Sequence, residues 1–171
     1  MSAMNDLPKR KRNRLSGDLY HLPGAYFITI CVHNKTNLFW SRAKLSDQQQ
    51  AGLTALGGIV EEQMHLTIAG YAPMVSLEKY VIMPNHVHML ISLKQCPEHR
   101  CPDIRYVVRL YKRNVSLRSG STIWQKGFHD HIVRNEEEYR MIWKYIDENP
   151  MRWELDRYYI HEDGWTLEPG R

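Results

Sequence analysis

One short segment limits what this chain can fold into, and it reads MPNHVHMLISL over residues 83–93. Side chains alternate between the two faces of a β-strand, so the odd and even positions of this segment separate. The odd positions are all apolar and must face a core: Val87, Met89, Ile91 and Leu93. His86 and His88 therefore project together from the opposite face. Two neutral imidazoles so placed can bind one divalent cation, although the same pattern also occurs as two half-exposed histidines without a ligand.

Hydrophobic periodicity and turn residues elsewhere in the chain predict an α+β fold. Strands are expected at 26–33, 74–83, 86–93 and 129–134. Helices are expected at 47–69, 102–118 and 135–149, with Asp47, Pro102 and Asn135 at their starts and Pro150 ending the last one. The order of the elements predicts a ferredoxin-like antiparallel four-stranded sheet with two helices packed on one face, plus a C-terminal helix and tail.

The chain reads as one domain with two appended segments. A basic arm is expected at residues 1–22, a folded domain at 23–150 and an irregular tail at 151–171, anchored by aromatic residues that include Trp153 and Tyr158. A chain of 171 residues can bury a core without disulfides. The three cysteines, the lack of an apolar secretory leader and the short apolar runs favour a cytoplasmic protein without a membrane span. Cys96, His99 and Cys101 lack a fourth zinc ligand and are expected in a loop.

The positive charge is unevenly placed. The net charge is +4, the pI is near 9.0, and residues 9–14 alone hold five lysines and arginines. The second expected helix carries only positive charges between residues 105 and 118. We expect these two groups to contact a polyanion, with a solvated surface as the alternative. The residues concerned are Arg10, Arg12 and Arg14 in the arm and Arg105, Arg109, Lys112 and Arg113 in the helix.

Four segments of the chain resemble one family in the family's order. They read PGAYFITI at 23–30, VIMPNHVH at 81–88, IWQKGFHDHIVRN at 123–135 and YIDENP at 145–150. Histidine-hydrophobic-histidine on a central strand is the signature of the HUH single-strand nucleases. The four segments together resemble the REP-associated and related insertion-sequence tyrosine transposases, over most of the chain from Pro23 to Pro150.

This resemblance implies a role for individual side chains. Tyr145 matches the family's covalent nucleophile, and His86, His88 and Asn149 match its metal ligands. A residue before proline is often displaced from helical geometry, which makes Glu148 the substitute third ligand. Such a site suits Mg²⁺ or Mn²⁺, which accept oxygen and imidazole ligands and leave positions for phosphate oxygens.

The same resemblance implies cleavage of single-stranded DNA. Attack by the tyrosine would leave a 5′-phosphotyrosine and a free 3′-hydroxyl, which allows rejoining without ATP. Periodicity alone does not choose Tyr145 over Tyr111 or Tyr139. His129-Asp130-His131 forms a second His-x-His, a competing ligand pair that also suits a structural or DNA-facing strand. In the family's version of this segment, His131 and Arg134 are the recurring residue types, and Arg134 is a further expected DNA contact.

The implied substrate is single-stranded or hairpin DNA, cut at the foot of an imperfect hairpin. The tail at 151–171 favours a monomer, with a homodimer possible, and the protein would associate with the nucleoid when bound to DNA. A non-catalytic nucleic-acid-binding module with a ferredoxin-like sheet is the chief alternative. A small metallohydrolase that uses the histidines without covalent catalysis is the third.

Overall fold

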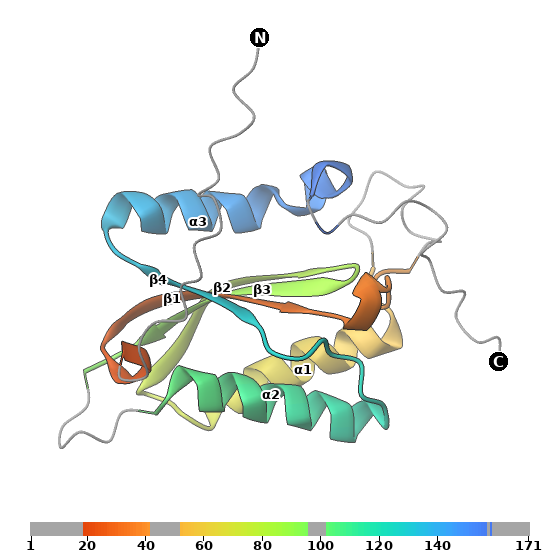
Figure 1. Ribbon diagram of the computed structural model, residues 1–171, viewed down its shortest axis with the longest axis horizontal. Coiled ribbons are helices and arrows are strands. Elements are labelled where there is room, and N and C mark those ends of the chain that lie inside the picture. The colour runs from red at the N-terminus through yellow and green to blue at the C-terminus, as the bar shows by residue number, and fades with distance from the viewer. Residues whose placement is uncertain (1–18, 42–51, 96–101, 157, 159–171) are drawn as a thin grey trace, which may run out of the picture.

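A four-stranded antiparallel sheet forms the middle layer of the molecule (Figure 1). The computed structural model describes residues 19–41, 52–95, 102–156 and 158. The sheet has the order β2-β3-β1-β4. Its strands are β1 (Gly24–Cys31), β2 (Val75–Met83), β3 (His86–Leu93) and β4 (His129–Val133). The expected α+β fold with this sheet is confirmed.

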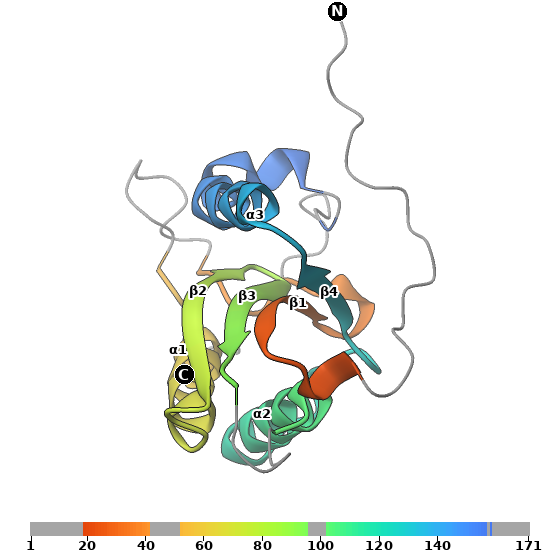
Figure 2. The same ribbon diagram turned by 90° about the vertical axis from the view of Figure 1, so that its left-hand side faces the viewer.

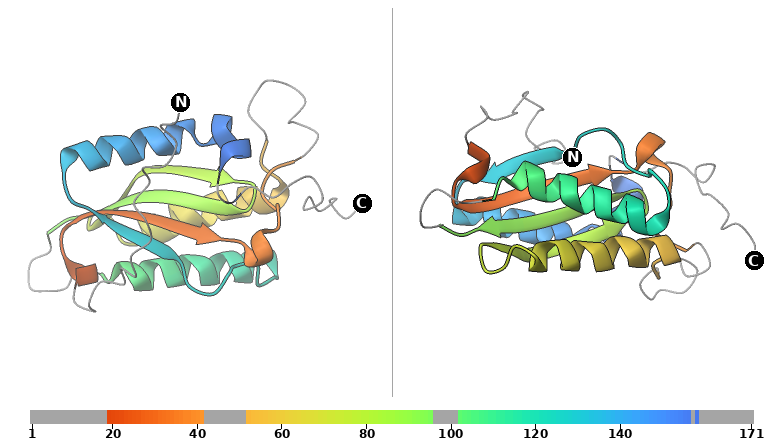
Figure 3. Two further views of the ribbon diagram at one scale, coloured as in Figure 1. Left: turned by 45° about the horizontal axis from the view of Figure 1, so that its top comes forward. Right: turned by 90° about the horizontal axis from the view of Figure 1, so that it is seen from below.

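Helices α1 (Ala55–Ala69) and α2 (Ile104–Ser119) lie side by side on one face of the sheet (Figure 3). The predicted alternation along β3 is confirmed, because its four odd positions are at most 3% exposed and belong to the main core. They pack with the apolar sides of the two helices, including Met64 from α1 and Val107 and Tyr111 from α2. Burial of these side chains stabilises the fold by roughly 2 kcal/mol for each large residue.

Helix α3 (Glu136–Glu148) covers the other face of the sheet, so the molecule has three layers (Figure 2). The two helices expected on one face are α1 and α2, and the face that the third helix covers was not specified by the sequence. Lys79 of the edge strand β2 forms an ion pair with Asp147 of α3. Its ammonium group also makes a cation–π contact with Trp143 of the same helix, 4.7 Å from the ring centre. An amphipathic helix needs an apolar surface, and α1 and α2 already occupy the opposite one.

The first two helices begin later than their sequences suggest. Helix α1 begins at Ala55, because the Thr54 hydroxyl accepts a hydrogen bond from the amide of Gly57 at 3.0 Å. Asp47 lies outside the described residues, and Gly52 to Thr54 are not helical. Helix α2 begins after Asp103, whose carboxylate accepts from the Arg105 amide at 2.7 Å, so Pro102 precedes the helix. Both helices therefore begin directly after the residue whose side chain accepts a hydrogen bond from a backbone amide in the first turn.

The two ends of α3 differ in how well they were predicted. The Asn135 side chain accepts from the Glu138 amide at 2.8 Å, which confirms the expected cap. At the other end, α3 stops at Glu148, before Pro150 as expected, but Pro150 does not lead into irregular chain. It begins a 3-10 segment, η5 (Pro150–Leu155), and so part of the expected irregular tail is ordered. Within the described residues, no helix has the length and apolar character needed to cross a membrane.

Candidate active site

Strand β3 brings two histidines together beneath α3. The Nε2 atoms of His86 and His88 lie 3.0 Å apart, and both side chains are 0% exposed. Two nitrogen ligands about 2.1 Å from one ion, at right angles, would also lie about 3 Å apart. A carboxylate oxygen of Asp156, which follows η5, joins the same cluster, in which all ligand atoms lie within 4.8 Å of one another. The arrangement therefore fits a divalent cation.

The neighbouring Asn85 fixes the proton on His86. Its amide nitrogen donates to the carbonyl oxygens of Lys35 at 2.9 Å and Tyr158 at 2.8 Å. Its amide oxygen is therefore the atom 2.9 Å from Nδ1 of His86, and Nδ1 must donate to it. A neutral His86 then has its lone pair on Nε2, directed at His88. This tautomer is the one that a metal ligand needs.

Thr29 of β1 supports His88 in a comparable way. Its hydroxyl lies 2.8 Å from Nδ1 of His88, to which it can donate or from which it can accept. Nε2 of His86 carries a lone pair, and two lone pairs 3.0 Å apart would repel each other. Either a proton on Nε2 of His88 or a cation bound by both nitrogens must therefore lie between the two rings. When Thr29 accepts the Nδ1 proton, His88 also turns a lone pair to the common point. The hydroxyl thus serves both the protonated and the metal-bound pair.

Tyr145 of α3 reaches this histidine pair. Its hydroxyl lies 3.4 Å from Nε2 of His88, and the two ring centroids are 5.3 Å apart. The ring also meets Phe27 of β1 edge-on at 6.0 Å. The side chain is partly exposed.

The competing tyrosines do not share this position. Tyr111 is buried on the opposite face of the sheet, where its hydroxyl donates to the Val60 carbonyl at 3.1 Å and burial raises its pKa. Tyr139 packs against Trp143, and burial, followed by nearby carboxylates, raises its pKa. The contact with a candidate metal ligand separates Tyr145 from both.

Asn149 has a buried side-chain amide whose two polar atoms have no hydrogen-bond partner within the described residues. It keeps helical backbone angles of −57° and −44° although Pro150 follows it, so the expected displacement before proline does not occur. The side chain is 3% exposed, and neither its amide oxygen nor its nitrogen has a hydrogen-bond partner within the described residues. An unsatisfied buried amide costs about 1–3 kcal/mol and calls for an explanation. Glu148, the substitute ligand, is instead paired with Lys144 and Arg152.

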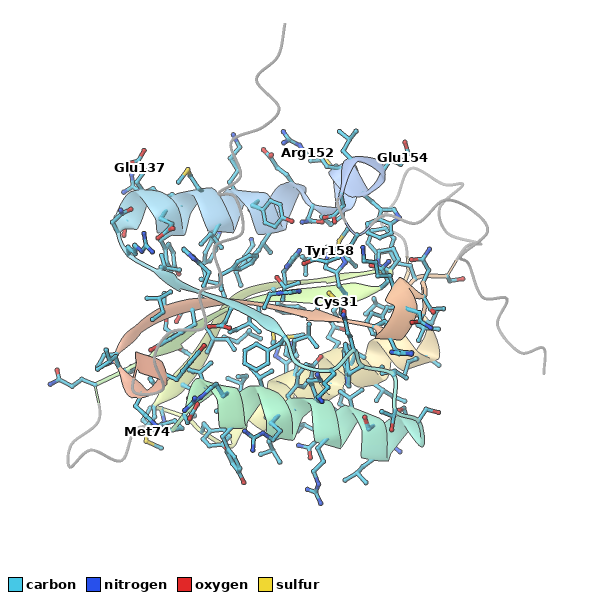
Figure 4. The ribbon with its side chains drawn as sticks, viewed as in Figure 1. Cys31, Met74, Glu137, Arg152, Glu154 and Tyr158 are labelled. Carbon is cyan, nitrogen blue, oxygen red and sulfur yellow. The ribbon has the colours of Figure 1, made fainter. Side chains whose placement is uncertain are left out.

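The segment after α3 covers the histidines. Trp153 of η5 is buried, with its ring 6.3 Å from that of Trp40 and 6.0 Å from that of His86. The Tyr158 ring lies 4.5 Å from the His86 ring, between η5 and the sheet (Figure 4). The two histidines are therefore not half-exposed, as the alternative interpretation of the motif would have them. The cause is the apolar cover that α3 and η5 supply.

Only some of the expected DNA-binding residues offer a free charge. Arg109, Arg113 and Arg134 are exposed. Lys112 instead donates to the carbonyl oxygens of Gln125 at 2.8 Å and Gly127 at 2.7 Å, and burial lowers its pKa. Helix α2 also lies on the opposite face of the sheet from α3, the helix that carries Tyr145 (Figure 1).

The remaining two groups of expected contacts differ in their surroundings. Arg105 pairs with Asp103 at 3.0 Å and stacks on Tyr20, with its guanidinium carbon 4.5 Å from the ring centre. Its charge is therefore already balanced by a carboxylate. Arg10, Arg12 and Arg14 lie outside the described residues, as do Cys96, His99 and Cys101.

The second His-x-His motif joins β4 to α3. Nε2 of His131 lies 2.6 Å from a carboxylate oxygen of Glu138, and the second oxygen accepts from the Arg134 amide at 2.7 Å. Burial raises the pKa of Glu138, but these hydrogen bonds outweigh it and hold the pKa below its ordinary value. His129 pairs in register with Thr29, so β1 separates it from His88. This motif therefore does not add a ligand to the β3 pair.

Three residues of the site were missed by the sequence analysis. Asn85 and Thr29 orient the histidines, and Asp156 adds a carboxylate. The position of Asn85 beside the His-x-His motif was an available signal. Nothing in the periodicity pointed to Thr29 or Asp156, because strand register and chain reversal bring them to the site.

Comparison with known proteins places this geometry in context. No family model matches the chain. An uncharacterised protein of Haemophilus influenzae is 34% identical over 173 residues, which cover 88% of this chain and 93% of that protein. A second protein of Haemophilus influenzae, described as "Putative REP-associated tyrosine transposase", is 24% identical over 140 residues, covering 75% of this chain and 71% of its own.

A solved structure shares the fold. It is that of a REP-associated tyrosine transposase bound to a REP hairpin, with a TM-score of 0.60 and 21% sequence identity. The superposition covers 81% of this chain and 73% of that chain. At this identity the likeness concerns the arrangement of the sheet and helices.

Proposed function

Because this chain belongs to the REP-associated tyrosine transposase family, we propose that it cleaves and rejoins single-stranded DNA with Tyr145 as the covalent nucleophile. Its membership supports a transposase-like function in general. The more specific proposal is a metal-dependent endonuclease and strand transferase that forms a 5′-phosphotyrosine at hairpin DNA.

One observation carries this proposal: the Tyr145 hydroxyl and the two histidine Nε2 atoms converge on one place. The hydroxyl lies 3.4 Å from Nε2 of His88, which lies 3.0 Å from Nε2 of His86. A nucleophile beside a pair of metal ligands is the arrangement that phosphodiester cleavage requires. One chain supplies all three groups, which favours a monomer with a complete site.

The ligand set that we propose is His86, His88 and Asn149, holding Mg²⁺ or Mn²⁺. The unpartnered buried amide of Asn149, one helical turn after Tyr145, supports its role. When bound, the cation supplies positive charge that stabilises the phosphate oxygens in the transition state and favours ionised tyrosine. Two imidazoles and an amide leave positions open for the scissile phosphate.

The chain's own groups then have separate tasks. Asn85 accepts the Nδ1 proton of His86, and Thr29 would accept that of His88 in the metal-bound form, so that both Nε2 lone pairs point inward. Phe27 and His88 hold the Tyr145 ring through edge-on contacts, which limits the directions from which its oxygen can attack. Attack forms the bond from the tyrosine oxygen to phosphorus and breaks the bond to the 3′-oxygen, which takes up a proton. The reverse step joins a second 3′-hydroxyl and returns the tyrosine.

The experiment that tests the proposal is covalent trapping. The full chain is incubated with 5′- and 3′-labelled hairpin DNA carrying a single-stranded flank, with Mn²⁺ or with EDTA, and resolved on a denaturing gel. We expect an adduct that keeps the label on the 3′ side of the cut, forms only with the metal and disappears when unlabelled 3′-hydroxyl strand is added. DNA binding without any adduct on hairpins that the protein binds tightly would favour the non-catalytic module instead.

The exposed arginines of α2 provide a separate prediction about DNA affinity. Arg109→Glu should weaken binding to all sequences and flatten its salt dependence, because an exposed charge near phosphate acts through counterion release. Lys112→Met should instead lower stability by about 1–3 kcal/mol, since it leaves two carbonyl oxygens without their donor. Salt-dependent fluorescence anisotropy and thermal unfolding measure the two effects. Unchanged affinity of Arg109→Glu at low salt would assign α2 to the solvated surface.

A further inference from the structure

The turn that follows α3 places a carboxylate beside the histidine pair. Segment η5 ends at Leu155, and the amide of the next residue, Asp156, donates to the Trp153 carbonyl at 3.0 Å. A carboxylate oxygen of Asp156 lies within 4.8 Å of a ring nitrogen of His86 and of His88. Asp156 comes about 70 residues after the two histidines in the sequence, so the fold itself has assembled this group.

Several contacts hold Asp156 in this place. Its Oδ1 accepts from the Tyr158 amide at 2.7 Å, which closes a small turn after η5. The Tyr158 carbonyl in turn accepts from Asn85, the residue that also fixes the His86 tautomer. The Trp153 and Tyr158 rings pack on the His86 ring from the same segment. One network therefore positions the carboxylate and the first histidine together.

The geometry points to Asp156 as a carboxylate ligand of the proposed cation, so that metal binding and docking of residues 150–156 are one linked event. Two imidazoles and an amide carry no charge, whereas a carboxylate neutralises half the charge of a divalent ion in a buried site. Four protein ligands still leave two positions of a six-coordinate ion for phosphate oxygens. This inference rests on the metal-dependent function proposed above. It adds that the segment after α3 sets the affinity of the site for the cation.

Linkage follows from the ligand's location. Asp156, directly after η5, can reach the ion only while Trp153 and Tyr158 are packed on the His86 ring. A cation that binds only when η5 is packed against the sheet stabilises that packed state relative to the state in which η5 is released. The cation is thus expected to hold η5 against the sheet, and loss of the carboxylate is expected to uncouple the two.

The test is Mn²⁺ affinity of the full chain, measured from free Mn²⁺ by electron paramagnetic resonance and by calorimetry. Asp156→Asn keeps an oxygen that can accept from the Tyr158 amide, so the turn should survive, while the negative charge is lost. We expect Mn²⁺ binding to weaken by about tenfold or more, on the scale seen when a partner group of a metal site is removed. The rise in unfolding temperature on adding Mn²⁺ should shrink in parallel.

The matched control is Glu154→Gln, which removes the same charge from the same segment. Glu154 is exposed and points away from the sheet, whereas Tyr158 lies against it (Figure 4). This variant should bind Mn²⁺ as the unchanged protein does. Equal Mn²⁺ affinity in Asp156→Asn and the unchanged protein would overturn the inference, as would equal losses in Asp156→Asn and Glu154→Gln.

The outcomes separate this inference from the proposed function. If the unchanged chain binds Mn²⁺ and Asp156→Asn weakens it, but no covalent adduct forms on any hairpin, the ligand assignment stands and the nuclease proposal fails. If adduct formation requires Mn²⁺ while Asp156→Asn binds it unchanged, the nuclease proposal stands and the ligand assignment fails. Metal-free unfolding of Asp156→Asn shows whether the fold is intact. If it is unstable, Asp156→Glu, which keeps the negative charge, should retain Mn²⁺ binding.

Discussion

Tyr145→Phe is expected to abolish both strand cleavage and the covalent protein–DNA adduct, by at least about a thousandfold. The change removes the attacking oxygen and nothing else. Contacts of the ring with Phe27 and His88 remain, and the 3.4 Å contact of the hydroxyl with a histidine nitrogen is lost. Stability should therefore change by at most about 1 kcal/mol, and hairpin binding should remain near that of the unchanged protein. Denaturing gels, thermal unfolding and anisotropy measure these three quantities.

Tyr139→Phe is the matched control, because Tyr139 lies on the same helix and faces Trp143 instead of the histidines. It should cleave DNA and form the adduct as the unchanged protein does. An adduct that persists in Tyr145→Phe would show that another hydroxyl attacks, and Tyr139 would be the first to test by peptide mapping. Loss of DNA binding together with cleavage would show that Tyr145 serves substrate binding, which a hydroxyl 3.4 Å from His88 does not predict.

Strand parity explains why so much of the fold could be predicted. A residue's face on β3 depends only on its position, so the core side and the side of the histidines followed directly. Helix starts were less accurate, because the capping residues Thr54 and Asp103 compete with other plausible caps nearby. What covers the second face could not be derived locally. Burial of His86 and His88 depends on α3 folding back over the sheet and on Trp153 and Tyr158 beyond it.

The site could also be predicted only where it depends on local sequence. The histidine pair follows from a local motif, whereas the choice among ten tyrosines needs the packing of α3 on β3. Periodicity gives Tyr139 and Tyr145 comparable positions, and family resemblance alone distinguished them. Asp156 lies in a short turn without any hydrophobic pattern, so its approach to the histidines depends on the path of the chain after Pro150.

Replacing the histidines should damage both metal binding and folding, because the pair is fully buried. His88→Ala should weaken Mn²⁺ binding by about a hundredfold or more and abolish adduct formation, since it removes the ligand nearest the nucleophile. It also leaves the Thr29 hydroxyl without its ring partner and removes a ring that stacks on Phe27 at 5.1 Å. The expected loss of stability is about 2–4 kcal/mol, well above the cost of an exposed strand substitution.

His129→Ala separates these effects from a general response to losing a histidine on this face. His129 is exposed on β4, in register with Thr29, with β1 between it and His88. Metal affinity and adduct formation should therefore be unchanged, and stability should fall by no more than about 0.5 kcal/mol. If His88→Ala still cleaves at the rate of the unchanged protein while His129→Ala does not, the metal site lies at β4. In that case Tyr145 would lie beside a structural histidine, and the contact at 3.4 Å would carry no catalytic meaning.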